Sequence, residues 1–142
     1  MPHDFNRWPE LTNSQMDIYY FESPHKQITE DIRVKVIKVH DADTITVRWS
    51  ERDFDFPVRF LDIDAPELNA GGHRARDWLT QQILNEEVDL IIDKNQRVGK
   101  WGRLLAKVQS GGLDLGEWMM SQGLVTSFED RRPGEIPALI WP

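Results

Sequence analysis

The chain has 142 residues, of which 39% are hydrophobic, and it carries a formal net charge of −7 with a pI near 5.0. This length and composition suit one globular domain with a single core. The absence of cysteine excludes a disulfide framework, a thiolate metal site and a cysteine nucleophile. The acidic charge excludes broad, purely electrostatic binding to nucleic acid, so any such binding has to come from a local basic patch.

Residues 1–30 show no clear periodicity but contain the aromatic side chains of Trp8, Tyr19, Tyr20 and Phe21. Because disordered tails are usually poor in aromatics, we predict an ordered N-terminal arm that lies on the domain or on a second subunit, as in a homodimer. The first residues are too polar for a signal peptide, and no stretch approaches the roughly 20 apolar residues of a membrane span. We therefore expect a cytoplasmic protein without a membrane association.

Strands are predicted from Arg33 onward. The stretches "VKVIKV" and "TITVRW" both alternate, and the intervening "HDAD" supplies turn residues, so they predict a β-hairpin. The stretch "FDFPVRFLDI" predicts a third strand, which ends before Ala65 and Pro66.

The stretch "GGHRARDWLTQQILNEE" places Ala75, Trp78, Leu79 and Ile83 at helical spacing and predicts an amphipathic helix. The segments "VDLII" and "RLLAKVQ" predict two more strands, which flank the polar loop "DKNQRVGKWG". A second short helix is predicted for "LDLGEWMMSQGL", which contains a glycine stop signal near its end.

Five short strands with a helix between the third and the fourth match a small closed barrel. The predicted fold is mainly β with α (α+β): a five-stranded OB-type β-barrel with two short helices and an N-terminal arm. We divide the chain into the arm at residues 1–30, the barrel domain at residues 31–128 and a C-terminal tail at residues 129–142.

Four aspartates occur in two neighbouring segments of the chain: Asp41, Asp43, Asp62 and Asp64. They would repel one another if they clustered without a counter-charge. A hard cation would remove the repulsion, and Asp43 and Asp64 with a backbone carbonyl and waters would form a calcium site. The alternative is that "HDAD" is simply a turn, where Asp is common because it makes local hydrogen bonds.

Arg59 and Glu67 carry charge at unusual positions. An arginine on an apolar strand is costly to bury unless it is paired or faces a cleft, and its planar guanidinium suits phosphate oxygens. Glu67 follows Pro66, where the chain leaves the strand, and this position suits a general base that acts on a water molecule. The alternatives are a structural arginine and an ordinary loop carboxylate.

The stretch between Asp93 and Asp114 is positively charged although the chain as a whole is acidic, because this stretch contains no acidic residue. Its cationic residues are Lys94, Arg97, Lys100, Arg103 and Lys107. Trp101 lies among them, and interleaved aromatic and basic residues suit stacking on a base while the backbone is gripped. We therefore expect Lys100, Trp101 and Arg97 to bind substrate. The alternative is a solvated loop whose tryptophan caps the core.

The motifs "DADT", "RFLDIDAPE", "QRVGKWGR" and "SQGL", in this order, resemble those of the staphylococcal nuclease (thermonuclease) family over roughly residues 33–128. Each motif is weak alone, whereas their joint order and spacing are specific. The resemblance implies a nuclease-like OB-fold domain. It also implies a calcium-dependent nuclease that hydrolyses the phosphodiester bonds of DNA, RNA or both and leaves 3′-phosphate ends.

The resemblance implies a calcium site as well. Asp43 and Asp64 would supply its carboxylates, Ala65 its backbone carbonyl, and Asp41 would contact the ion through water.

The resemblance further assigns the catalytic residues. Arg59 and Arg103 would hold the scissile phosphate, and Glu67 is the proposed base. A rival from another functional class is a catalytically silent OB-type module that binds nucleic acid or protein. The presence of Asp43 and Asp64 together with these three residues speaks against the rival.

Overall fold

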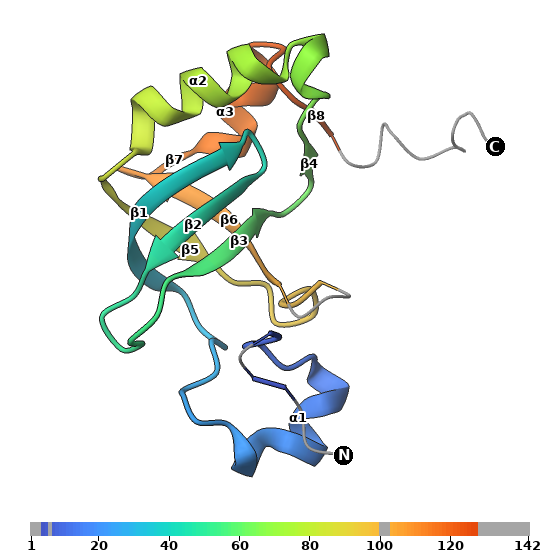
Figure 1. The fold of residues 1–142 in the computed structure, drawn as a ribbon. Coiled ribbons are helices and arrows are strands. Elements are labelled where there is room, and N and C mark those ends of the chain that lie inside the picture. Colours follow the sequence, from blue (N-terminus) through green and yellow to red (C-terminus); the bar gives the residue numbers. More distant parts are fainter. Residues whose placement is uncertain (1–3, 6, 100–102, 128–142) are drawn as a thin grey trace, which may run out of the picture.

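The computed structural model describes residues 4, 5, 7–99 and 103–127, which form a β-barrel between a pair of helices and an N-terminal segment (Figure 1). In chain order the elements are α1 (Asn13–Tyr19), η1 (Tyr20–Glu22), β1 (Ile32–Asp41), β2 (Thr44–Arg48), β3 (Phe56–Phe60), β4 (Ile63–Asp64), η2 (Leu68–Ala70), α2 (Gly72–Ile83), β5 (Glu87–Ile91), β6 (Leu104–Ser110), β7 (Leu113–Asp114), α3 (Leu115–Ser121) and β8 (Thr126–Ser127).

Five of the strands close into a barrel in the order β3, β2, β1, β5, β6. Neighbours in this order run antiparallel, and the parallel pairing of β3 with β6 closes the ring, with Val58 opposite Leu104 and Phe60 opposite Ala106. The predicted OB-type barrel of five strands is therefore confirmed. Three short strands add to it, because β7 extends the β6 edge and β4 pairs with β8.

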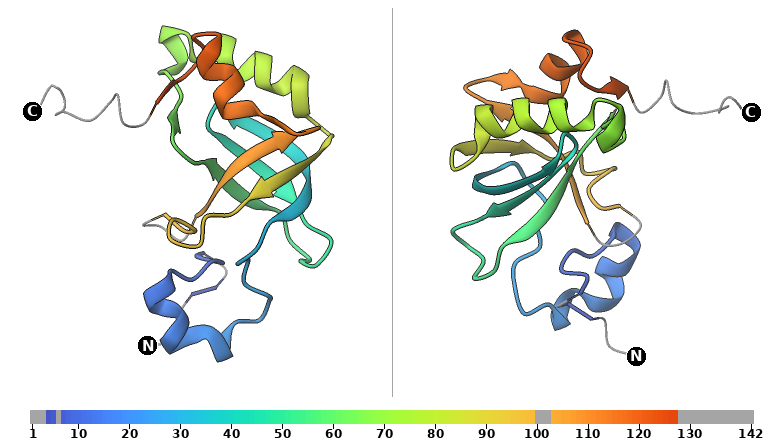
Figure 2. Two further views of the ribbon diagram at one scale, coloured as in Figure 1. Left: turned by 180° about the vertical axis from the view of Figure 1, so that it is seen from behind. Right: turned by 45° about the horizontal axis from the view of Figure 1, so that its top comes forward.

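The core lies inside the barrel and under the helices. The period-two alternation of the strands turns these apolar side chains inward: Val34, Val36, Ile45, Val47, Phe56, Val58, Phe60, Val88, Leu90, Leu104, Ala106 and Val108. Val39 is also buried, because a register shift after Val36 in the pairing of β1 with β2 interrupts the alternation. Both α2 and α3 lie at one end of the barrel (Figure 2). Ala75, Leu79 and Ile83 of α2, with Leu115 and Met119 of α3, are buried, so the two predicted helices are confirmed.

The structure adds a helix that the sequence did not predict, α1 in the N-terminal arm. A capping box between Thr12 and Gln15 begins it, since each side chain accepts a hydrogen bond from the other residue's amide. Tyr20 and Phe21 are 51% and 98% exposed in the single chain, so these two aromatic side chains do not pack on the barrel domain. The arm instead buries Leu11 and polar side chains.

A homodimer through the arm stays a prediction. None of the helices in the described ranges combines the length and the apolar character that crossing a bilayer requires. The C-terminal tail predicted at residues 129–142 lies outside the described residues, and so do Lys100 and Trp101.

Candidate active site

Three charged residues meet where the turn after β1, strand β3 and strand β4 come together. Arg59 Nη2 lies 2.9 Å from Asp64 Oδ1 and 3.4 Å from Asp43 Oδ2. The side chains of Arg59, Asp43 and Asp64 are only 18%, 12% and 9% exposed. The structure thus brings together the two predicted calcium carboxylates and one of the predicted phosphate-binding arginines.

The local sequence explains why Arg59 reaches both carboxylates. Val58 and Phe60 face the core, so the intervening Arg59 points to the opposite face of β3. The chain then reverses at Asp62, whose φ of 69° is in the left-handed region, and β4 returns beside the arginine. Arg59 Nη1 donates to the carbonyls of Phe60 at 2.8 Å and Ile63 at 3.0 Å, which ties the guanidinium to this turn.

Asp43 is held by hydrogen bonds to both of its carboxylate oxygens. The backbone amide of Ala65 donates to Oδ2 at 2.8 Å, and the hydroxyl of Thr44 donates to Oδ1 at 2.9 Å. The first bond joins the β1–β2 turn to the chain directly after β4. It therefore places Ala65, the predicted carbonyl ligand, next to the carboxylate of Asp43.

The carboxylates of Asp41 and Asp43 influence each other's ionisation. Burial, followed by the neighbouring Asp43 carboxylate, raises the pKa of Asp41 to about 6. Burial also acts to raise the pKa of Asp43, but hydrogen bonds from Asp41 and Ala65 and the charge of Arg59 outweigh it, so that pKa is lowered. Asp43 therefore ionises at lower pH than Asp41. Asp41 accepts a hydrogen bond from the Asp43 amide at 3.1 Å.

Glu67 lies just beyond this cluster and is exposed. Its carbonyl accepts hydrogen bonds from the amides of Ala70 and Gly72, both at 2.9 Å, and these bonds form the turn that begins α2. A Cβ atom at Gly72 would lie 2.6 Å from the carbonyl oxygens of both Pro66 and Glu67. The glycine therefore permits the close approach that fixes the backbone of Glu67 between β4 and α2.

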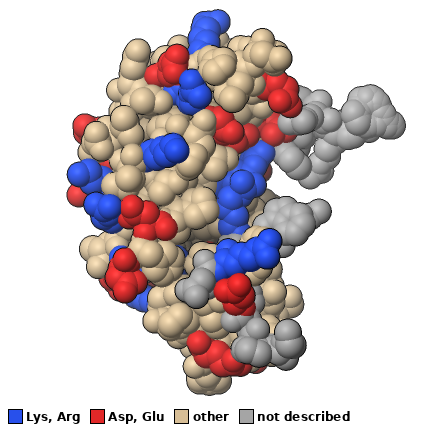
Figure 3. All heavy atoms as spheres, viewed as in Figure 1, with Lys and Arg blue, Asp and Glu red and all other residues tan. Residues whose placement is uncertain are grey.

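Arg103 precedes β6 and belongs to the same face of the sheet as Arg59. In the parallel pairing of β3 with β6, Arg59 stands opposite Leu105, and Arg103 is two residues before Leu105. The period-two alternation around the buried Leu104 puts Arg103 and Leu105 on one face. On the side shown in Figure 3, Lys and Arg side chains form a run along the middle of the molecule, with acidic side chains at its upper end.

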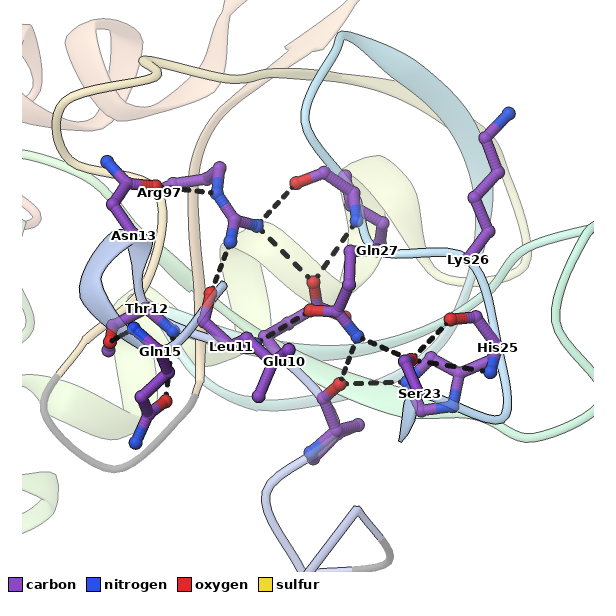
Figure 4. A network of polar contacts seen from close by, with 12 residues as sticks. Glu10, Leu11, Thr12, Asn13, Gln15, Ser23, His25, Lys26, Gln27 and Arg97 are labelled. Carbon is purple, nitrogen blue, oxygen red and sulfur yellow. Dashed lines mark hydrogen bonds and ion pairs between the residues drawn. The ribbon is translucent and has the colours of Figure 1, made fainter. Parts of the chain in front are cut away.

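The structure contradicts the expectation that Arg97 binds substrate. Arg97 is only 3% exposed, and its guanidinium donates to the carbonyls of Leu11 and Ile28 and faces the carboxylate of Glu10 (Figure 4). Burial lowers the pKa of Arg97, and Glu10 opposes this shift. The positive charge predicted to grip a nucleic-acid backbone is instead neutralised inside the protein.

The donor set of the site consists of oxygen atoms. In the described ranges no group of three or more His, Cys, Asp or Glu side chains is placed to hold a metal ion. The side chains available to bind a cation are the carboxylates of Asp43 and Asp64. Asp41 lies next to them, since its carboxylate accepts a hydrogen bond from the Asp43 amide. Two carboxylates with carbonyl and water ligands fit a hard divalent cation and do not fit a soft one.

Two residues that shape the site were not identified from the sequence. Thr44 supplies the hydroxyl that orients Asp43, and the signal for it was its place in "DADT" directly after the aspartate. Gly72 was assigned only to a helix start. The pair Gly71-Gly72 after "APELNA" was the available signal, since adjacent glycines often mark a close backbone approach.

Sequence comparisons agree with this architecture. The family described as staphylococcal nuclease homologue matches residues 57–139, which is more than half of the chain. The chain is similar to an uncharacterized protein of Bacillus anthracis, with 31% identity over 101 residues that cover 66% of this chain and 46% of the relative. It is also similar to a protein of Leptosphaeria maculans named probable endonuclease LCL3, with 29% identity over 103 residues, 65% of this chain and 34% of the relative.

The chain therefore spans less than half the length of either of these two curated relatives. The matched residues include β3 apart from its first residue, β4, both helices that cover the barrel and the predicted catalytic residues Arg59, Glu67 and Arg103. The resemblance to this family is confirmed: the chain belongs to the family of staphylococcal nuclease homologues.

Proposed function

We propose that the protein is a calcium-dependent nuclease that hydrolyses phosphodiester bonds of DNA, RNA or both. The observation that carries the proposal is the contact of one guanidinium, that of Arg59, with both Asp43 and Asp64. This arrangement puts a phosphate-binding cation beside two hard-cation ligands. The family match and the name of the Leptosphaeria relative support the same reaction class.

Asp43, Asp64 and the carbonyl of Ala65 would hold the calcium ion, with Asp41 contacting it through water. A bound calcium ion would supply positive charge next to the scissile phosphate and its attacking water. The flexible oxygen set favours calcium over magnesium, because magnesium demands a near-ideal octahedron. The amide of Ala65 already orients Asp43, and Arg59 contacts both carboxylates, so a bound calcium ion would share or replace the contacts of Arg59.

In the proposed reaction, Arg59 and Arg103 bind the non-bridging phosphate oxygens and stabilise the charge that grows on them in the transition state. Glu67 accepts a proton from the attacking water. The water oxygen bonds to phosphorus, the bond from phosphorus to the 5′ oxygen breaks, and that oxygen takes up a proton. The products are a 3′-phosphate end and a 5′-hydroxyl end.

The second candidate function is a catalytically silent module that binds nucleic acid or protein. It is favoured by the burial of Arg97, which removes one of the cations expected to contact the substrate. The nuclease and the silent module would have the same fold and could both bind nucleic acid. Only a measurement of cleavage distinguishes them.

A digestion assay distinguishes these two functions. The full chain is incubated with single-stranded and double-stranded DNA and RNA in calcium, magnesium or chelator. We expect cleavage in calcium, little in magnesium and none in chelator, with products whose 3′ ends carry phosphate. Binding without cleavage under every condition would support the silent module instead.

A further inference from the structure

We propose that the N-terminal segment, residues 9–28, is a positioning element of the active site. In this inference, which rests on the proposed catalytic role of Arg103, Glu10 and Asn13 hold the β5–β6 connection and thereby fix where Arg103 lies. The structure describes residues 92–99 and 103 of this connection, and the stretch 92–99 lies between the N-terminal segment and the barrel (Figures 1 and 2).

The centre of this contact is Arg97, which belongs to the connection but bonds to the N-terminal segment (Figure 4). Its Nη1 donates to the carbonyl of Ile28 at 2.6 Å, and its Nη2 donates to the carbonyl of Leu11. Nη1 also lies 3.5 Å from Oε1 of Glu10. Because these groups are buried, water cannot readily replace them, and breaking the contacts would leave a buried guanidinium without partners.

Asn13 adds two bonds at the start of α1. Its Nδ2 donates to the carbonyl of Lys94 at 2.9 Å, and its Oδ1 accepts from Arg97 Nε at 3.4 Å. The capping box of Thr12 and Gln15 fixes the turn from which Asn13 projects. Through Asn13, which is exposed and lies outside the core, the N-terminal segment thus contacts both the backbone and a side chain of the β5–β6 connection.

Glu10 links the connection to a second part of the barrel. Its Oε2 lies 2.6 Å from Nη1 of Arg52, in the chain between β2 and β3. The Arg52 side chain is fully buried, donates to the carbonyl of Lys26 at 2.7 Å and lies over the ring of Phe56 at 4.6 Å. One buried carboxylate therefore spans two arginines from two loops of the barrel.

The backbone transmits the position of Arg97 to Arg103. The carbonyl of Arg97 accepts from the amide of Leu105 at 2.9 Å, and the amide of Gly99 donates to the carbonyl of Arg103 at 2.8 Å. Val98 and Leu104 form a β-bridge between these two bonds. Arg103 is thus held by a short ladder whose other strand is fixed by the N-terminal segment. A shift of about 1 Å in a phosphate-binding group can cost on the order of 100-fold in rate.

The test uses three variants of the full chain. Asn13→Ala removes the two side-chain contacts with Lys94 and Arg97, and Glu10→Gln removes the charge that pairs with the two buried arginines. Lys26→Ala is the matched control, because it removes an exposed ion pair between the same segment and Glu51 without touching the β5–β6 connection. For each variant we would measure kcat and KM for a nucleic-acid substrate, thermal stability, and amide exchange at Gly99 and Leu105.

We expect Asn13→Ala to lower kcat about 10-fold, with a smaller change in KM and a melting temperature within a few degrees of wild type. Amide exchange at Gly99 and Leu105 should be faster in this variant. Glu10→Gln should show the same kinetic pattern with lower stability, because a buried arginine loses its counter-charge. If Glu10→Gln does not fold, Asn13→Ala decides. Lys26→Ala should match wild type in every measurement.

Normal kcat in Asn13→Ala would overturn the inference, whether or not amide exchange becomes faster. Unchanged exchange at Leu105 would also overturn it, because the segment would then not hold the ladder. A wild-type chain that cleaves no nucleic acid would refute the proposed nuclease and with it the catalytic part of the inference. The exchange data would still decide whether the N-terminal segment holds the connection, so the two failures are distinguishable.

Discussion

Arg59 donates to Asp64 at 2.9 Å, and the same nitrogen lies 3.4 Å from Asp43. One arginine thus neutralises the two carboxylates that we propose as cation ligands. The charges concentrated around strand β4 are tolerated because they face one another, at the edge of a barrel whose interior is apolar. In the proposed reaction the same arginine also donates hydrogen bonds to the phosphate oxygens, so the phosphate site and the cation site share one residue.

Arg59→Lys should lower stability more than Arg103→Lys. Arg59 satisfies two backbone carbonyls and two carboxylates, and a lysine ammonium cannot reach them all. The loss for Arg59→Lys should be about 1–3 kcal/mol in the free energy of unfolding, measured by urea denaturation. Arg103→Lys, at a partly exposed position, should change it little. Equal effects of the two substitutions would contradict the structural role assigned to Arg59.

Asp43→Ala should weaken calcium binding by at least 10-fold, because it removes one of two carboxylates that face the site. Isothermal titration calorimetry with calcium measures this directly. Asp55→Ala is the control, since Asp55 pairs with Arg48 on another part of the surface. Unchanged calcium affinity in Asp43→Ala would remove Asp43 from the metal site.

Asp41→Asn should stabilise the protein at pH 7 more than at pH 4.5. The pKa of Asp41 is raised to about 6 in the folded protein, above its ordinary value of 3.8. Between these two values the folded state binds more protons than the unfolded state, so Asp41 makes stability fall as pH rises. The amide oxygen of Asn can still accept the bond from Asp43. Melting temperatures of wild type and Asp41→Asn, measured between pH 4.5 and pH 7, test the prediction. The same difference in melting temperature at every pH would contradict it.

Gly72→Ala should reduce both stability and turnover. Its new Cβ would meet the carbonyl oxygens of Pro66 and Glu67 at 2.6 Å, so the backbone that carries Glu67 has to move. Gly111→Asn is the control, because Gly111 has a φ of 58° with no atom near its Cβ position, and Asn tolerates that conformation. A Gly72→Ala variant with wild-type turnover would show that the position of this turn does not matter for the reaction.

Alternation in the strands and helical spacing in α2 were enough to predict the barrel. The inward faces of β2 and β3 follow directly from "TITVRW" and "FDFPVRF". For β1, "VKVIKV" predicts the inward Val34 and Val36, but not the register shift after Val36 that turns Val39 inward. The short pairing of β4 with β8 was not predicted, because each strand has only two residues and shows no period. Helix α1 was missed because its residues "NSQMDIY" contain no buried side chain and so show no apolar stripe.

The meeting of Asp43, Arg59 and Asp64 could be inferred from motif order, since turn and strand residues of one hairpin lie near the next strand. The burial of Arg97 could not, because its partners Glu10 and Leu11 are more than 80 positions away and lie in a segment without periodicity. In sequence, Arg97 looked like the other cations of its loop. Only the fold distinguishes a structural arginine from a substrate-binding one.

The most direct test of the proposed nuclease is the calcium-dependent hydrolysis rate of Arg59→Lys and Arg103→Lys, compared with wild type on one nucleic-acid substrate. Lysine keeps the charge but loses the planar fork that matches two phosphate oxygens. Arg33→Lys is the control, because Arg33 pairs with Asp89 on the surface. We predict losses of about 100-fold to 1,000-fold for both site variants and none for the control. Near-normal rates in Arg59→Lys and Arg103→Lys would contradict the mechanism.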